Sequence, residues 1–97
     1  YVSIKPTHVG LGTSEDLAFE LYARVARHCA ALKLRERVEM EDHRTTDGTL
    51  RVFARLWREH ANVGIVLQAR LFRTLADIDA LAPGPLDVRM VKGIYLE

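Results

Sequence analysis

The sequence has little cysteine, proline or glycine: one Cys, three Pro and six Gly among 97 residues. A single cysteine, Cys29, cannot form an internal disulfide, so the chain is not one of the small secreted domains that disulfides hold together. Because Cys29 lies in an apolar helical pattern, we expect a buried thiol in a reducing compartment. The longest apolar run, from Val63 to Leu67, is far too short to span a bilayer.

An excess of charge of one sign is also missing. The formal net charge is +1, and the Lys and Arg residues are scattered among acidic neighbours, which does not fit a nucleic-acid-binding surface. The sequence contains neither GxGxxG nor GxxxxGK, so we expect neither of these phosphate-binding loops. No two of the histidines have the spacing of metal ligands, and we expect no metal site; the histidines are His8, His28, His43 and His60.

What is present is the composition of a globular protein, 48% hydrophobic and 28% charged. Residues 1–97 are expected to form part of a single domain. Short runs rich in β-branched residues predict strands at Val2–Lys5, Arg37–Met40, Val63–Gln68 and Val88–Val91. Helical periodicity predicts three helices between them. The first is capped by Thr13 or Ser14, buries the stripe Leu17, Leu21, Val25 and Cys29, and ends near residue 32; the second spans about 50–61; the third begins at Thr74 and ends before Pro83-Gly84-Pro85.

This βαβαβαβ order predicts a parallel α/β sheet with helical crossovers. The polar residues that close the four strands are spaced 34, 29 and 24 residues apart; they are Lys5, Glu39, Gln68 and Lys92. A (β/α)₈ TIM-type barrel has about 31 residues per unit, although a doubly wound sheet also fits. About three βα units and a fourth strand leave two open edges. We therefore expect the remaining strands to come from a longer chain or from a second copy.

Active sites of parallel sheets lie at the carboxyl ends of the strands. Here Lys5 is suited to bind an anionic group and Gln68 a polar heterocycle, and Arg89 and Lys92 are suited to an electron-rich cofactor. These residue types indicate a small-molecule site but specify no reaction. Tyr22 and Trp57 lie in helical stripes and are interpreted as packing residues.

The acidic residues after the second strand have two interpretations. Glu39, Glu41 and Asp42 are suited to be general bases or metal ligands. On composition alone, a charged strand end neutralised by Arg35 and Arg37 is favoured.

Four strings of the sequence are specific when taken together. VRMVKGIY at 88–95, VGIVLQARLFRT at 63–74, VEMED at 38–42 and YVSIK at 1–5 occur in this order along the chain. Each resembles a motif of the proline dehydrogenase family, with the same order and spacing. The resemblance implies a (β/α)₈ barrel that binds FAD and oxidises L-proline to Δ¹-pyrroline-5-carboxylate, with electrons passed to a quinone or another acceptor. It also implies a cytoplasmic enzyme, in some cases peripheral to the inner membrane, of which this segment alone is inactive.

The resemblance assigns four residues to substrate and catalysis. Lys5 matches the lysine that pairs with the proline carboxylate, and Glu39 stands where the family has an acidic active-site residue. Arg89 matches an arginine near flavin N5, and Tyr95 lies beside the substrate pocket. The family usually has Asp in place of Glu39. Its pair of substrate-binding arginines lies on a final helix, beyond the segments matched here.

Cofactor contacts are implied for a second set, which includes Arg89. Gln68 matches the glutamine that hydrogen-bonds the flavin, and Met40 a flavin-contacting position. Lys92, Gly93 and Ile94 match the short segment that touches the cofactor, where Ala is usual in place of Ile94.

Two alternatives remain. In the first, the chain is a noncatalytic half-barrel module, and the missing pair of substrate-binding arginines favours this interpretation. In the other it belongs to a barrel lyase with Lys92 as Schiff-base nucleophile.

Overall fold

The structure is a computed structural model that describes residues 1–81 and 84–94. Strands and helices alternate along it, as the sequence predicts. The elements are β1 (Val2–Ile4), the 3₁₀ helix η1 (Pro6–Val9), α1 (Glu15–Ala31), β2 (Glu36–Val38), α2 (Thr46–Glu59), β3 (Val63–Gln68), α3 (Thr74–Leu81) and β4 (Val88–Val91).

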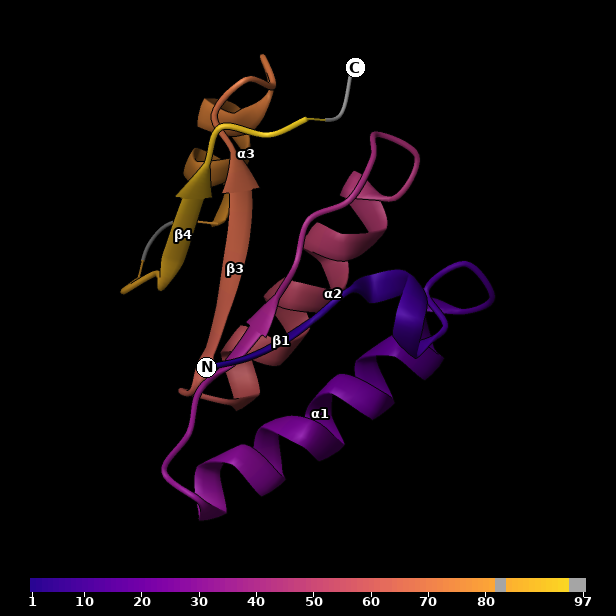
Figure 1. Cartoon of the computed structure of the whole chain (residues 1–97), viewed down its shortest axis with the longest axis vertical. Helices are drawn as coiled ribbons and strands as arrows, with labels where there is room; N and C mark the ends of the chain where they lie inside the picture. Colours follow the sequence, from indigo (N-terminus) through magenta and orange to yellow (C-terminus); the bar gives the residue numbers. More distant parts are fainter. Residues whose placement is uncertain (82–83, 95–97) are drawn as a thin grey trace.

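The described strands form one parallel sheet in the order β1-β2-β3-β4 (Figure 1). Each crossover therefore moves the chain one strand further in the same direction. A doubly wound sheet reverses direction at a switch point, whereas right-handed crossovers that never reverse place all helices on one face. The predicted (β/α)₈ barrel type is confirmed, with three βα units and a fourth strand in this chain.

The strand register separates a helix-covered face from an open face. Ile4 pairs with Val38, Val38 with Ile65, and Ile65 with Val88. Val38 and Ile65 are fully buried, and Ile4 and Val88 pack against the same hydrophobic core. Successive side chains of a strand point to opposite faces, so the residues between these face what would be the barrel interior.

Helix α1 begins as predicted. The Ser14 side chain accepts a hydrogen bond from the Leu17 backbone N–H at 3.2 Å, and Glu15 and Asp16 in the first turn suit the helix dipole. The buried stripe differs from the prediction by one position, because Leu17 is 43% exposed. The residues that face the core are mostly small and let the helix approach the sheet closely; they are Ala18, Tyr22, Ala23, Ala26 and Cys29.

The bounds of β2 and α2 differ from the prediction, whereas Thr74 and Tyr22 agree with it. Strand β2 is Glu36–Val38 rather than Arg37–Met40, and α2 begins at Thr46, inside the expected polar loop. Thr74 does begin α3, but its hydroxyl donates to the Gln68 carbonyl. Tyr22 is a packing residue as predicted, since it is fully buried and its hydroxyl donates to the Ile4 carbonyl at 2.6 Å.

Glu36 is a buried acid at the start of β2. It is fully buried, and neither carboxylate oxygen has a hydrogen-bond partner among the described residues. It shares the helix-covered face with Val38. Burial raises the pKa of Glu36 to about 8, so the carboxyl group is protonated in the folded chain at neutral pH.

An ion pair joins β2 to β4 across the open face. Arg35 Nε donates to Asp87 Oδ2 at 2.8 Å, and the Tyr1 hydroxyl donates to the same oxygen at 3.0 Å. The register places Gly64 of β3 beside Asp87, and a Cβ built on Gly64 would lie 2.8 Å from Asp87 Cγ and 2.9 Å from its carbonyl oxygen. A side chain at position 64 would therefore clash with Asp87 where it stands.

Gly64→Ala in the complete protein is expected to lower stability by about 1–3 kcal/mol, the usual cost of overpacking. A shift in the thermal unfolding midpoint would measure this loss. Gly12→Ala is the matched control, because no atom lies within 4 Å of a Cβ at position 12. Equal midpoints for both variants would show that Asp87 yields without cost.

Candidate active site

A row of charged side chains crosses the carboxyl end of the open face. One residue beyond the pairs Ile4–Val38 and Val38–Ile65, Lys5 stands beside Glu39 and Glu39 beside Val66. Val66 pairs with Arg89. The bond from the Glu39 N–H to the Ile4 carbonyl, 3.0 Å long, continues the ladder to this level. Neighbouring strands are about 4.8 Å apart, so these side chains rise from one surface.

The row holds a cation beside a carboxylate, then the apolar Val66, and then a second cation. Lys5 and Arg89 are exposed, and Glu39 is half-buried. A molecule with both an ammonium and a carboxylate group can pair with Glu39 and Lys5 at once. Arg89 remains as a planar cation that can stabilise negative charge on a second, adjacent group.

Gln68 and Gly93 form a ledge beyond this row, at the carboxyl end of β3. The Gln68 side chain is buried, and its Nε2 donates to the Glu41 carbonyl at 3.0 Å. Its Oε1 atom is buried without a partner among the described residues. Gly93 faces this oxygen with φ +94°, and a Cβ there would lie 2.5 Å from Oε1. An unsatisfied buried acceptor beside bare backbone is suited to a ligand N–H.

The segment after β4 borders this ledge. The Arg70 N–H donates to the Lys92 carbonyl at 3.1 Å, which continues the pairing of β3 with β4 beyond Val91. The side chains of Lys92 and Ile94 are exposed, Ile94 by 81%. Tyr95 lies outside the described residues.

Met40 is separated from the other predicted site residues. Its side chain is only 7% exposed and belongs to the hydrophobic core beneath the helices. At this position a ligand on the open face meets the Met40 backbone rather than its thioether.

Sequence reasoning did not foresee the role of Glu41. Its carboxylate is bound by Thr7, whereas Asp42 pairs with Arg44 at 2.6 Å and Arg35 with Asp87. The composition favoured neutralisation of the acids after β2 by Arg35, but Arg35 pairs with Asp87 instead. Among the described residues, no group of three or more His, Cys, Asp or Glu is arranged to hold a metal ion.

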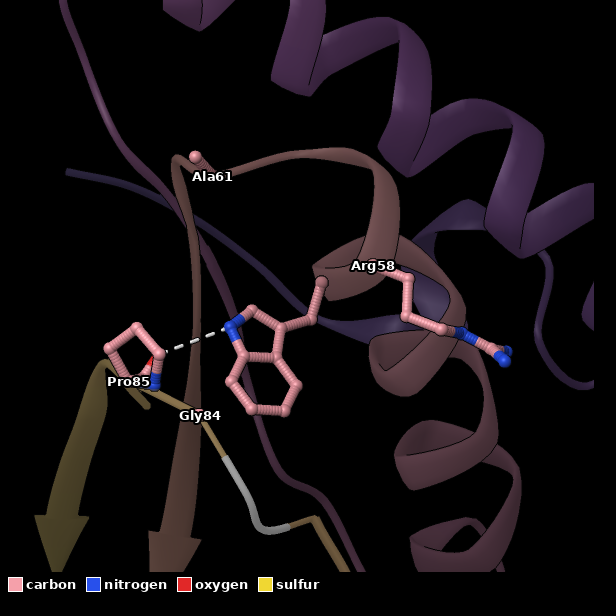
Figure 2. A pocket seen from close by; sticks show the side chains of 5 residues that line it. Arg58, Ala61, Gly84 and Pro85 are labelled. Carbon is pink, nitrogen blue, oxygen red and sulfur yellow. Dashed lines mark hydrogen bonds between the residues drawn. The ribbon is translucent and has the colours of Figure 1, made fainter.

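A pocket of about 380 Å³ lies at the other end of the strands (Figure 2). It is lined by Trp57 and by Ala61 and Pro85, which precede β3 and β4. Trp57 Nε1 donates to the Pro85 carbonyl at 3.2 Å, and its ring stacks on Phe53 with centroids 6.0 Å apart. Trp57 is thus a packing residue as predicted, remote from the charged row.

The chain resembles known proteins over its whole length, although no family model matches it. It is 35% identical over 97 residues to proline dehydrogenase 2 of Bacillus subtilis, which covers all of this chain and 32% of that protein. It is 40% identical over 105 aligned residues to proline dehydrogenase of Deinococcus radiodurans, again covering all of this chain and 33% of the relative. The chain thus spans about a third of the curated relatives it matches.

A solved structure shares the fold. Proline utilization A (PutA) from Bdellovibrio bacteriovorus, inactivated by N-propargylglycine, superposes with a TM-score of 0.81 and 26% identity. The match covers 95% of this chain and 12% of that one.

Proposed function

We propose that the chain is part of a proline dehydrogenase and that the complete protein oxidises L-proline to Δ¹-pyrroline-5-carboxylate with FAD, because the chain resembles proline dehydrogenases over its whole length. The observation that carries the proposal is the row Lys5, Glu39 and Arg89 beside the unsatisfied Gln68 oxygen. Electrons leave to a quinone or another acceptor. We place the enzyme in the cytoplasm, peripheral to the inner membrane where the acceptor is a membrane quinone. The described residues contain no helix that is both long and apolar enough to cross a membrane.

The residues at the Gln68 ledge fit a flavin. The Oε1 atom of Gln68 has no partner among the described residues and is suited to accept from the N–H of a flat heterocycle. Glycine is needed at position 93 because the Gln68 side chain occupies the place of a Cβ there. Lys92 and Ile94 are exposed where they would border the cofactor, and Met40 would offer it backbone atoms. When bound, FAD would accept the hydride that proline loses, which carries both electrons of the oxidation.

The remaining residues orient the substrate. In this proposal the Lys5 ammonium binds the proline carboxylate in a charge-assisted pair, and Glu39 faces the ring nitrogen. Glu39 is one methylene longer than the usual Asp and narrows the pocket. Tyr95 is assigned to the pocket wall by the resemblance. Arg89 stabilises negative charge that develops during the transfer.

The rest of the barrel is the partner that this segment requires. The sheet has unpaired edges at β1 and β4, and large apolar side chains near β4 are exposed in the chain alone; they are Phe72, Leu75, Met90 and Ile94. Further strands of the same enzyme would cover them, and a second copy of this segment is the alternative in a noncatalytic half-barrel.

An absorbance spectrum of the purified complete protein tests the function. We expect flavin bands that bleach when L-proline is added without oxygen. A protein that binds no flavin after incubation with FAD, and that elutes as a dimer of half-barrels, would instead support the structural module. Borohydride trapping of a carbonyl substrate on Lys92 would support the lyase.

Lys5→Ala is expected to weaken substrate binding by about 10- to 100-fold, since a hydrogen bond to a charged group contributes roughly 1.5–3 kcal/mol. Titration with cyclopentanecarboxylate, which keeps the ring and carboxylate of proline but cannot be oxidised in the same way, measures the dissociation constant directly. Arg27→Ala on the exposed side of α1 is the control. An unaltered constant in Lys5→Ala would remove Lys5 from the site.

A further inference from the structure

The Glu41 carboxylate is fully engaged by a single residue. Thr7 donates to it twice, from its backbone N–H to Oε2 at 3.0 Å and from its hydroxyl to Oε1 at 2.8 Å. The two residues are 34 positions apart in the chain. Thr7 lies in η1, which begins directly after Lys5, so this contact attaches the segment that follows Lys5 to the end of β2.

The main chain of Glu41 makes a second connection. Its carbonyl accepts the 3.0 Å hydrogen bond from Gln68 Nε2. Because Nε2 is the donor atom of the amide, this bond leaves Oε1 turned toward Gly93. The position of Glu41 therefore determines which atom Gln68 presents at the ledge.

One residue thus links the carboxyl ends of three consecutive strands. Through Thr7 it holds the Lys5 end of β1, it follows β2 itself, and through Gln68 it holds the end of β3. Substrate and cofactor groups must be held within a fraction of an ångström for efficient reaction. Since each oxygen of Glu41 accepts a hydrogen bond from Thr7, the carboxylate is suited to a structural role.

We infer that Glu41 is a positioning residue, which sets the distance between the Lys5 ammonium and the Gln68 amide; this inference rests on the proposed function. It does not touch substrate or cofactor. Its loss should let η1 move and carry Lys5 away from the carboxylate that it binds.

The test is Glu41→Gln in the complete enzyme loaded with FAD. The amide keeps the size of the side chain but removes its charge, so both contacts with Thr7 become neutral hydrogen bonds, one of them with the hydroxyl as acceptor, and each is weaker than its charge-assisted counterpart. We expect the dissociation constant of cyclopentanecarboxylate, read from the flavin spectrum, to rise about tenfold. KM for proline should rise in parallel, while kcat changes by less than about threefold.

Three further variants separate this role from others. Thr7→Val removes the hydroxyl but keeps the backbone N–H, and it should raise the same constant by about threefold. The double variant should match Glu41→Gln alone, because both changes weaken one connection. Asp42→Asn is the matched control, since it removes the neighbouring carboxylate, which binds Arg44 instead, and it should leave the constant unchanged.

Two outcomes overturn the inference without touching the proposed function. One is a wild-type enzyme that bleaches with proline while Glu41→Gln and Thr7→Val bind the analogue as tightly as wild type does. The other is a loss confined to kcat with a changed pH profile, which would identify Glu41 as a proton-transfer group. If the wild-type flavin fails to bleach, the proposed function itself fails. Should Glu41→Gln not fold, Thr7→Val still decides the question.

Discussion

Arg89→Ala in the complete enzyme is expected to slow flavin reduction by proline by roughly 10²- to 10³-fold, the usual effect of removing one donor that stabilises transition-state charge. Arg89 projects from the open face in the row of Lys5 and Glu39. In the completed barrel its guanidinium would be shielded from water, where a fixed positive charge acts more strongly than in solution. Anaerobic rapid mixing that follows flavin absorbance measures the rate.

The companion variants identify the origin of this loss. Arg89→Lys keeps the charge but loses the planar set of donors, so we expect an intermediate rate. Arg24→Ala, on the exposed surface of α1, should reduce at the wild-type rate. Wild-type flavin reduction in Arg89→Ala would mean that this arginine does not contact the reacting groups.

Glu36→Gln is expected to stabilise the protein at neutral and alkaline pH. The pKa of Glu36 is raised from 4.5 to about 8 in the folded chain because its carboxyl group is buried. Below pH 4.5 the group is protonated in both states and contributes no pH dependence. Between 4.5 and about 8 the unfolded chain releases the proton while the folded chain retains it, so stability falls as pH rises.

The slope of this fall is about 1.4 kcal/mol for each pH unit. Glutamine has nearly the same shape and cannot ionise, so the variant should lose this dependence. The environment of Glu36 lies on the helix-covered face and is supplied by described residues. Its charge also contributes, after burial, to the raised pKa values of the Tyr22 hydroxyl and the Cys29 thiol.

Denaturant midpoints of the complete enzyme at pH 5, 7 and 9 check this prediction. The advantage of Glu36→Gln over wild type should be small at pH 5, larger at pH 7 and constant beyond about pH 8. Glu59→Gln, at the exposed end of α2, should follow wild type at every pH. A constant difference across this range would show that Glu36 ionises normally in the folded protein.

The bounds of β3 and β4 agree with the prediction. The apolar run of β3 is characteristic of a buried parallel strand, and all six of its residues are buried, whereas β4 contains Arg89 and is only partly buried. The predicted strand Arg37–Met40 begins one residue later than β2 and ends two residues later, so Glu36 fell outside it. An acid outside a predicted strand is expected to be solvated, whereas the same acid at the first position of the strand shares the helix-covered face with Val38. Charge alone did not reveal that position.

The candidate site was predictable only in its residue types. Position at a strand end predicted Lys5, Glu39, Gln68 and Lys92 as site residues. The register places Lys5 and Glu39 at one level with Arg89, which lies inside β4. The contact of Glu41 with Thr7 depends on how the loop after β1 folds back. Whether Met40 points to the core or to the open face depends on which alternate positions of the strand face the helices. The short, charged segment Arg37–Met40 has no apolar alternation that would predict this.

The sequential strand order also bears on how the protein is made. Each strand of this sheet pairs with the one that left the ribosome just before it, and each βα unit has its packing partners already synthesised. Pairings between neighbouring units require only short chain closures, which form faster than distant ones. The edges of the described sheet at β1 and β4 have no such neighbour among the described residues, so they are where a chain whose barrel is still incomplete exposes unpaired backbone groups.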